Sequence, residues 1–389
     1  MRIASVLLRR TADVMRIAKS VLCRRNSVIT LLIVGTFIFW IVVTVISQRT
    51  PTDDEDDNTT VDLVPETQPT IRVDFRSKVM EQSILTSKGV LSYDEVERNV
   101  FRPNNYFIAG RRSPLLKLDY INKSTCAEVF DEWLSIAQRK NSDIKPPRRI
   151  PSSMQDAFLL SGYAFLQNRY YNDKTDSSEV DWNPLMADLM RYPADQLTGY
   201  REQGLSMYHA LRDYPLHNQV GFVVGSETPW VEIHALKSGA RKVFTVEYQR
   251  ILISEKYNIS YIHPIDFASQ WAKNRGTFDF AISFSSIEHS GLGRYGDILD
   301  PIGDLREVRK IRCLLKNKGL FFVAVPRGVD MILFNAHRFY GRMRLSMLMT
   351  GFEWLATYRG STPHPVVPKQ DDFENFGLNH QDLFVLQKT

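Results

Sequence analysis

The chain is poor in cysteine and lacks the residue patterns that bind zinc. Its 389 residues include only three cysteines, Cys23, Cys126 and Cys313, with no Cys-x-x-Cys pair and no cluster of histidine and cysteine. This excludes the usual structural zinc sites. Cys126 and Cys313 can pair in an oxidising compartment, but the sequence leaves open whether they are close enough. Cys23 is either a palmitoylation site or an unmodified thiol.

A basic globular domain is also missing, although the net charge of the whole chain is +5. Residues 1–27 contain seven basic residues and one acidic residue, so this tail carries +6 and the remainder of the chain carries −1. A nearly neutral remainder argues against nucleic-acid binding.

Charged side chains are absent from residues 28–47, VITLLIVGTFIFWIVVTVIS. At about 1.5 Å rise per residue, a helix of this length reaches roughly 30 Å, the thickness of the bilayer's hydrocarbon core. Basic residues precede the segment and the acidic run Asp53–Asp57 follows it, so residues 1–27 are expected in the cytosol and the rest in a lumen or outside the cell. The run is longer than a cleaved signal peptide's, which favours an uncleaved signal anchor. A single-pass type II protein of the Golgi, the endoplasmic reticulum or the cell surface is therefore expected.

Between this anchor and the C-terminal part, the sequence indicates two regions without a clear fold. Residues 48–72 are rich in threonine, proline and acids, which predicts a flexible stem. Residues 73–190 have mixed helical patterning with proline-rich interruptions, and we expect a helical or irregular region there. Three N-x-S/T sequences, at Asn58, Asn122 and Asn258, agree with a lumenal domain.

An α/β domain is expected over residues 191–389, because short apolar runs alternate with amphipathic stretches from Asn218 onward. The expected strands are Val220–Val224, Lys242–Val246, Ser260–His263, Phe278–Phe284 and Leu320–Val325, and the expected helices are Pro229–Lys237 and Asp304–Leu315. The helix at Asp304 is expected to be capped by Asn317-Lys318-Gly319. This alternation predicts a doubly wound, mostly parallel Rossmann-like sheet with helices on both faces. Ligands of such sheets bind beyond the carboxyl ends of the strands.

The order of these features resembles class I S-adenosylmethionine-dependent methyltransferases. The resemblance is carried by a glycine after strand one, an acid ending strand two, Ile287-Glu288-His289 after strand four, and the run from Leu305-Arg306-Glu307-Val308 to Leu314–Leu320. It implies that Phe352–Tyr358 and Asp382–Gln387 are antiparallel strands that close the sheet.

A finer resemblance is to domain-of-unknown-function family 268, and it covers about Arg191 to the C-terminus. The segments that carry it are Gly225-Ser226 with Pro229-Trp230 and Glu232, Thr245–Tyr248, Ser286–His289 with Gly291–Asp297, and Asn335–Arg338 with Tyr340-Gly341.

The resemblance implies that S-adenosylmethionine is the cofactor. A glycine turn lets the backbone approach such a ligand, and Gly225 and Ser226 follow the first strand. A carboxylate at the end of the second strand can take both ribose hydroxyls, which is the role of Glu247 unless it is only a surface acid. Asp266 is a candidate for holding the adenine amino group or, alternatively, for capping a helix. Ser285, after the fourth strand, is a further candidate for contact with the cofactor.

The turn after strand one departs from the class I pattern. Class I enzymes usually have an acid in strand one and three glycines in the turn that follows. Here Val223, Glu227 and Pro229 occupy the acidic and the later glycine positions. The pocket for the methionine part of the cofactor must therefore differ, and a catalytically inactive binding domain is an alternative.

His289 is the leading candidate for a general base, because a histidine poised near neutral pH can deprotonate an acceptor hydroxyl. Glu288 either orients His289 or contacts the substrate; alternatively, both residues only shape the loop. Related quinone methyltransferases place a metal at a Glu-x-x-Glu-His motif, but Ser285 stands at the first glutamate position, so no metal is expected. Arg294, Tyr295 and Asp297 form a glycine-flanked loop that either lines an acceptor site or is a structural turn. Asn335, His337 and Arg338 are expected to face the cleft, unless Arg338 instead pairs with a carboxylate.

The resulting hypothesis is a lumenal S-adenosylmethionine-dependent methyltransferase that acts on a hydroxyl of a glycan or another small-molecule acceptor of the secretory pathway. One alternative is an inactive methyltransferase-like domain that binds sugars or proteins. The other is a Golgi-type glycosyltransferase, which shares the type II topology with a stem. No Asp-x-Asp that could hold a metal and a nucleotide sugar follows a strand, because Asp54 and Asp56 belong to the stem.

Overall fold

The computed structural model describes residues 82–139, 145–173, 178–376 and 380–389. The expected cytosolic tail, membrane anchor and stem, which together span residues 1–72, lie outside these ranges and stay predictions. Within the described ranges, no helix combines the length and the apolar character that crossing a bilayer requires.

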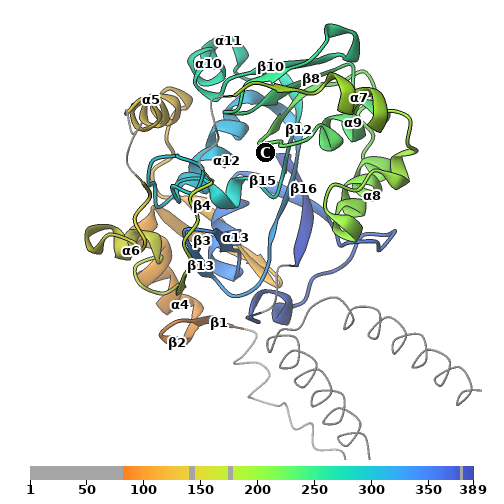
Figure 1. Ribbon diagram of the computed structural model, residues 1–389. Coiled ribbons are helices and arrows are strands. Elements are labelled where there is room, and N and C mark those ends of the chain that lie inside the picture. The colour runs from red at the N-terminus through yellow and green to blue at the C-terminus, as the bar shows by residue number, and fades with distance from the viewer. Residues whose placement is uncertain (1–81, 140–144, 174–177, 377–379) are drawn as a thin grey trace, which may run out of the picture. The chain divides into compact units, whose positions relative to one another are not determined.

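A seven-stranded sheet runs through the centre of the fold (Figure 1). From one edge to the other its strands are β10 (Ile259–Ile262), β8 (Lys242–Val246), β7 (Val220–Val224), β11 (Phe278–Phe284), β12 (Leu315–Pro326), β16 (Gln381–Lys388) and β15 (Phe352–Tyr358). The first five are parallel to one another, and β16 is antiparallel to both of its neighbours. Counted along the chain, the order is 3-2-1-4-5-7-6, which is that of class I methyltransferases. The expected doubly wound, mostly parallel sheet is therefore confirmed.

The central strands follow the apolar runs of the sequence, because a strand covered on both faces is apolar throughout. The bounds of β7, β8 and β11 are those expected from the sequence. The expected cap Asn317-Lys318-Gly319 is wrong, because β12 already begins at Leu315. The three residues instead form a bulge: Leu315 pairs with Phe278 and Leu320 with Phe280, and Lys318 has a φ of 63°.

Helices cover both faces of the sheet (Figure 1). One face packs against α5 (Cys126–Ala137), α10 (Pro264–Ser269), α12 (Gly303–Leu314) and α13 (Arg342–Leu348). The other face packs against α7 (Asn183–Leu189), α8 (Leu205–Asp213) and α9 (Trp230–Lys237). Two apolar clusters of the core accordingly lie one on each face of the sheet, and a third, smaller cluster contains Val329, Met331 and Phe339.

The described residues between Ser83 and Met190 belong to the same compact unit as the sheet. The hairpin of β3 (Tyr106–Arg112) and β4 (Leu115–Tyr120) packs on α13. A small sheet places β13 (Met331–Phe334) between β5 (Phe165–Asn168) and β14 (His337–Phe339), which joins this region to the chain that follows β12. The remaining strands and α-helices of the described ranges are β1 (Ser83–Thr86), β2 (Gly89–Ser92), β6 (Val180–Asp181), β9 (Ile251–Leu252), α4 (Tyr93–Val96), α6 (Gln155–Phe158) and α11 (Trp271–Asn274).

A disulfide joins Cys126, the first residue of α5, to Cys313 in α12. It answers the question of pairing that the sequence left open, and it closes a loop across 187 positions of the chain. Side chains tie the same two helices: Trp133 Nε1 donates to Glu307 Oε1 at 2.6 Å, and Lys310 Nζ lies 3.3 Å from the centre of the Trp133 ring. Helix α5 is thus fixed to α12.

Replacement of Cys126 by serine is expected to lower the free energy of unfolding by about 2–5 kcal/mol, because the disulfide no longer constrains the unfolded chain. Thermal unfolding of the purified full-length chain without reductant measures the change. Cys23→Ser is the matched control, since it leaves the Cys126–Cys313 bond intact. Equal transitions for Cys126→Ser and the wild type would contradict the expectation.

Candidate functional site at the carboxyl edge of the sheet

The turn after β7 lies against the loop after β11. Gly225 has a φ of 72°, and a Cβ atom built on it would lie 1.9 Å from the Ser286 hydroxyl oxygen. A side chain at this position would therefore clash with the loop after β11. The close approach of the turn after β7 to the loop after β11 is enough to explain why this residue is a glycine, and no cofactor is needed for that explanation.

Glu247 follows β8 at the same edge, and its carboxylate holds the turns around it. One oxygen accepts from the Ser226 N–H at 3.0 Å, and the other accepts from the N–H groups of Tyr248 and Gln249 at 2.7 and 3.3 Å. Burial raises the pKa of Glu247, although these hydrogen bonds act against the rise. Each carboxylate oxygen has about two acceptor positions, so the oxygen bonded to Ser226 can accept one more donor.

Asp266 lies further along the edge, in the first turn of α10, and its side chain is exposed. The residue that caps this helix is His263, whose Nδ1 accepts from the Ile265 N–H at 3.3 Å. The alternative role of Asp266 as the helix cap is therefore taken by another residue, and its carboxylate faces solvent beyond the end of β10.

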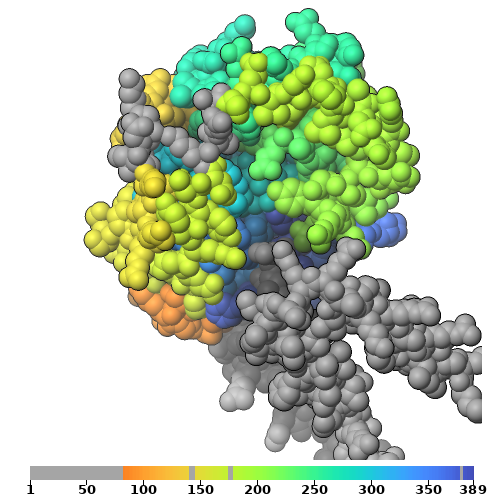
Figure 2. Space-filling view, viewed as in Figure 1, coloured from red at the N-terminus to blue at the C-terminus, as the bar shows by residue number. Residues whose placement is uncertain are grey.

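A cavity of about 460 Å³ lies beyond the ends of β11 and β12. Its lining residues are Gly199, Tyr200, Arg201, Gln203, Ser285, Glu288, His289, Pro326, His337 and Gln381. Figure 2 shows a hollow in the molecular surface between the segments coloured yellow and green. The structure thus brings Ser285, Glu288 and His289 together. Of the other candidates, Gly225, Ser226, Glu247 and Asp266 are not among the lining residues.

The His289 ring is held in one tautomer by the backbone. Its Nδ1 lies 2.6 Å from the carbonyl oxygen of Ala336, and a carbonyl only accepts, so Nδ1 carries the hydrogen and Nε2 is an acceptor. Burial lowers the pKa of His289 to about 3, and the nearby Arg294 and His337 contribute to the decrease. The ring is therefore neutral at physiological pH, with Nε2 at 3.8 Å from Glu288 Oε1. The expectation of a histidine poised near neutral pH is wrong, because burial lowers the pKa of the ring far below that range.

Glu288 is the end of a short hydrogen-bonded chain. Gln381 Nε2 donates to Ser285 Oγ at 2.6 Å, and Ser285 Oγ donates to Glu288 Oε1 at 2.8 Å. The Glu288 side chain is 1% exposed, and this burial raises its pKa to about 7. It therefore titrates near neutral pH, unlike an ordinary carboxyl group.

Three buried polar atoms of the lining residues have no hydrogen-bond partner among the described residues. They are Glu288 Oε2, His337 Nε2 and Gln381 Oε1. Buried polar atoms are nearly always paired in folded proteins, so these three are available to the polar groups of a ligand. His337, which the sequence indicated as a possible cleft residue, does line the cavity. No group of three or more His, Cys, Asp and Glu side chains in the described ranges is arranged to hold a metal ion.

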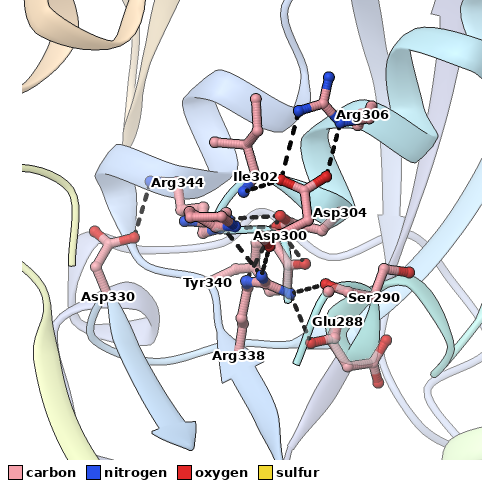
Figure 3. Close-up of polar contacts among 12 residues, drawn as sticks. Glu288, Ser290, Asp300, Ile302, Asp304, Arg306, Asp330, Arg338, Tyr340 and Arg344 are labelled. Carbon is pink, nitrogen blue, oxygen red and sulfur yellow. Dashed lines mark hydrogen bonds and ion pairs between the residues drawn. The ribbon is translucent and has the colours of Figure 1, made fainter. Parts of the chain in front are cut away.

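Arg338 does not line the cavity but fixes the loop that carries His289 (Figure 3). The Arg338 side chain is fully buried, and its Nη1 donates to the carbonyl oxygens of Glu288 and Ser290 at 3.3 and 2.6 Å. Its Nε lies 3.6 Å from Asp304 Oδ1, in the first turn of α12. Of the two roles considered from the sequence, pairing with a carboxylate is the one that the structure shows.

Asp304 is the centre of this buried network (Figure 3). Arg344 binds both of its oxygens, with Nε and Nη2 at 2.7 and 2.5 Å, and the Tyr340 hydroxyl donates to it at 2.9 Å. Burial alone would raise the pKa of Asp304, but the charges of Arg338 and Arg344 lower it to about 2. The carboxylate is therefore ionised, and it links α12 to β14 and α13.

Other polar residues near the cavity also hold the backbone. Asn335 is buried and exchanges two hydrogen bonds with the backbone of Tyr171, at 2.8 and 2.9 Å. Asp297 accepts from three N–H groups of its own glycine-flanked loop, and Arg294 pairs with Asp173 at 2.8 Å. The contacts of Asp297 and Arg294 correspond to the structural turn that was the alternative to an acceptor site. Asn335, which was expected to face the cleft, is not among the residues that line the cavity.

Sequence reasoning missed Tyr200, Arg201 and Gln381 as cavity residues. Tyr200 and Arg201 precede the first strand of the sheet, in a stretch without clear periodicity. Arg201 and Ser285 both have a φ of 52°, a conformation that costs about 1–3 kcal/mol and is often found at functional sites. Gln381 could have been found, because β16 is antiparallel to β12, so the first residue of β16 lies beside the last residue of β12. In the structure it pairs with Pro326.

The strand order and the position of the cavity define a methyltransferase-like α/β protein. Residues 218–389 match the family described as "Caenorhabditis protein of unknown function, DUF268". No curated protein matches the chain.

Solved structures that resemble the chain include S-adenosylmethionine-dependent methyltransferases. One is the Burkholderia thailandensis 1,6-didemethyltoxoflavin-N1-methyltransferase with bound S-adenosylhomocysteine, at 13% identity over 54% of this chain and 84% of that chain, with a TM-score of 0.33. Another is the enzyme from Mesorhizobium loti, at 13% identity over 48% of this chain and 100% of that chain, with a TM-score of 0.30. Because the identities and TM-scores are this low, the fold is assigned from the strand order of the sheet and not from these structures.

Proposed function

We propose that the protein is an S-adenosylmethionine-dependent O-methyltransferase. The observation that carries the proposal is the cavity at the carboxyl edge, where the acceptor nitrogen of His289 and three unpaired polar atoms meet. Ligands of open α/β sheets bind at this edge.

The residues present fit S-adenosylmethionine, but with a different set of contacts for its methionine part than class I enzymes usually have. Glu247 retains one acceptor position for a ribose hydroxyl, and the exposed carboxylate of Asp266 is the proposed partner of the adenine amino group. Val223, at the usual acidic position of strand one, is fully buried in the core, so it cannot serve the methionine part. The unpaired oxygens of Glu288 and Gln381 supply acceptors for the ammonium group instead.

When bound, S-adenosylmethionine supplies a methyl group on a positively charged sulfur. His289 Nε2 accepts the hydrogen bond of the acceptor hydroxyl and takes its proton as the oxygen becomes the nucleophile. Glu288, at 3.8 Å, stabilises the protonated ring when its own carboxyl is ionised. Arg338 holds the loop so that both side chains keep their positions.

The proposed acceptor is a hydroxyl of a glycan or a similar secretory-pathway molecule in the lumen. The proposed signal anchor at residues 28–47 places the domain there, and the Cys126–Cys313 disulfide is typical of an oxidising compartment. Tyr200 lines the cavity, is 43% exposed and lies against Phe284, so one ring face can pack on the apolar face of a sugar.

Glu247→Ala is expected to weaken binding of S-adenosylmethionine or S-adenosylhomocysteine by about 1–3 kcal/mol, the value of hydrogen bonds to a charged group. Calorimetry with the purified full-length chain measures this change. Glu255→Ala removes an exposed acid from the turn before β10 and serves as the control. Absence of binding by the wild type at millimolar ligand would favour the inactive binding domain.

A further inference from the structure

The sequence Asn122-Lys123-Ser124 lies on the surface after β4, and all three residues are exposed. The backbone of Asn122 is fixed by Asn105: the Asn122 N–H donates to Asn105 Oδ1 at 2.9 Å, and the Asn122 carbonyl accepts from Asn105 Nδ2 at 2.7 Å. The side-chain amide of Asn122 forms no hydrogen bond within the described residues. Its nitrogen is therefore held at an ordered, accessible position.

The sequence Asn258-Ile259-Ser260 lies where the short 3-10 helix Glu255–Tyr257 leads into β10. Asn258 is exposed and has a φ of 56°, while Ile259 is 1% exposed and packs in the core. The left-handed conformation explains an asparagine at this position. It does not explain the hydroxyl of Ser260, which completes the Asn-x-Ser sequence required for N-glycosylation.

Two further observations agree with modification at these positions. Cys126, two residues after Ser124, is oxidised in the disulfide with Cys313, as expected of a chain segment that enters an oxidising compartment. Strand β10 lies at an edge of the central sheet, with a partner on one side only among the described residues. A bulky, hydrated group beside this strand would protect the edge from pairing with other chains.

We infer that Asn122 and Asn258 carry N-linked glycans. At each site the amide nitrogen forms a bond to the anomeric carbon of an oligosaccharide whose donor is a lipid-linked diphosphate. The bond between that carbon and the diphosphate oxygen breaks, the lipid diphosphate leaves with the electron pair, and the nitrogen loses one proton. The inference depends on the proposed lumenal location and not on methyl transfer.

The test uses the full chain expressed in secretory eukaryotic cells, with Asn58→Gln as background because Asn58 lies outside the described residues. Electrophoretic migration is compared before and after treatment with peptide N-glycosidase. We expect the Asn122→Gln and Asn258→Gln variants each to lose one glycan, and the double variant to show no shift. Ser124→Ala and Ser260→Ala should lose the same glycans, whereas Ser124→Thr and Ser260→Thr should keep them.

The serine variants separate the loss of a glycan from the loss of the backbone role of each asparagine. Protease protection in intact microsomes is measured on the same samples. A protected domain that shows no shift with the glycosidase overturns the inference while the lumenal location stands. A domain that is digested in intact microsomes overturns both. A shift that persists in the double variant shows attachment elsewhere and also contradicts the assignment.

Discussion

The Asp304→Asn variant is expected to lose about 3–5 kcal/mol of the free energy of unfolding, the usual cost of breaking a buried ion pair from one side. The change removes the negative charge that compensates Arg338 and Arg344, all three side chains being at most 3% exposed. Asparagine fills a similar volume, so the loss comes from two buried cations that lose their shared carboxylate and not from a cavity.

Thermal unfolding of the purified full-length chain measures this loss. Glu179→Gln is the matched control, because Glu179 pairs with Arg250 at 2.7 Å in a bridge whose side chains are 35% and 71% exposed. Exposed ion pairs contribute only about 0–1 kcal/mol. If Asp304→Asn and Glu179→Gln unfold at the same temperature, Asp304 is not the centre of a stabilising network.

The central sheet could be predicted because its signals are local. Each of β7, β8 and β11 is an apolar run that ends at a glycine, an acid or a serine, and their bounds agree with the expectation. The strand order could not be derived from periodicity, and the resemblance supplied only the expectation that Phe352–Tyr358 and Asp382–Gln387 close the sheet. The bulge in β12 was missed because Lys318-Gly319 is as typical of a helix end as of a bulge.

The buried network and most of the cavity depend on contacts between distant parts of the chain. The run Arg342–Leu348 has two arginines in its first three residues, which is typical of an exposed helix, yet every residue of it is buried in the structure. Arg344 is compensated by Asp304, 40 positions away. Tyr200 likewise lines the cavity while it contacts the rings of Trp230 and Phe284, which are 30 and 84 positions away along the chain. No local pattern contains such information.

Only the part of the candidate site that is local in the sequence could be predicted. Ser285, Glu288 and His289 are neighbours along the chain, so locating the end of β11 located all of them. Gln381 and His337, which carry unpaired polar atoms, come from later segments. His337 was recognised from its motif, whereas Gln381 required the register of β16 against β12.

The His289→Ala variant is expected to lower the rate of methyl transfer by about 10²–10⁴-fold, the usual contribution of a general base. His289 Nε2 is the acceptor in the cavity, because Nδ1 donates to the Ala336 carbonyl. Its pKa of about 3 keeps it unprotonated, so the activity should not fall as the pH decreases from 8 to 5 through titration of this ring. Glu288, with a pKa near 7, would become protonated in that range and reduce the stabilisation of the protonated ring.

Incorporation of labelled methyl groups from S-adenosylmethionine into glycan, lipid and protein acceptors measures the rate. Thermal unfolding shows that each variant is folded, and His364→Ala, which changes an exposed histidine, is the control. Unchanged incorporation in folded His289→Ala would remove this residue as the base. No incorporation by the wild type into any of the three acceptor classes would overturn the proposed activity. The fold and the inferred glycosylation of Asn122 and Asn258 would be unaffected, because neither depends on methyl transfer.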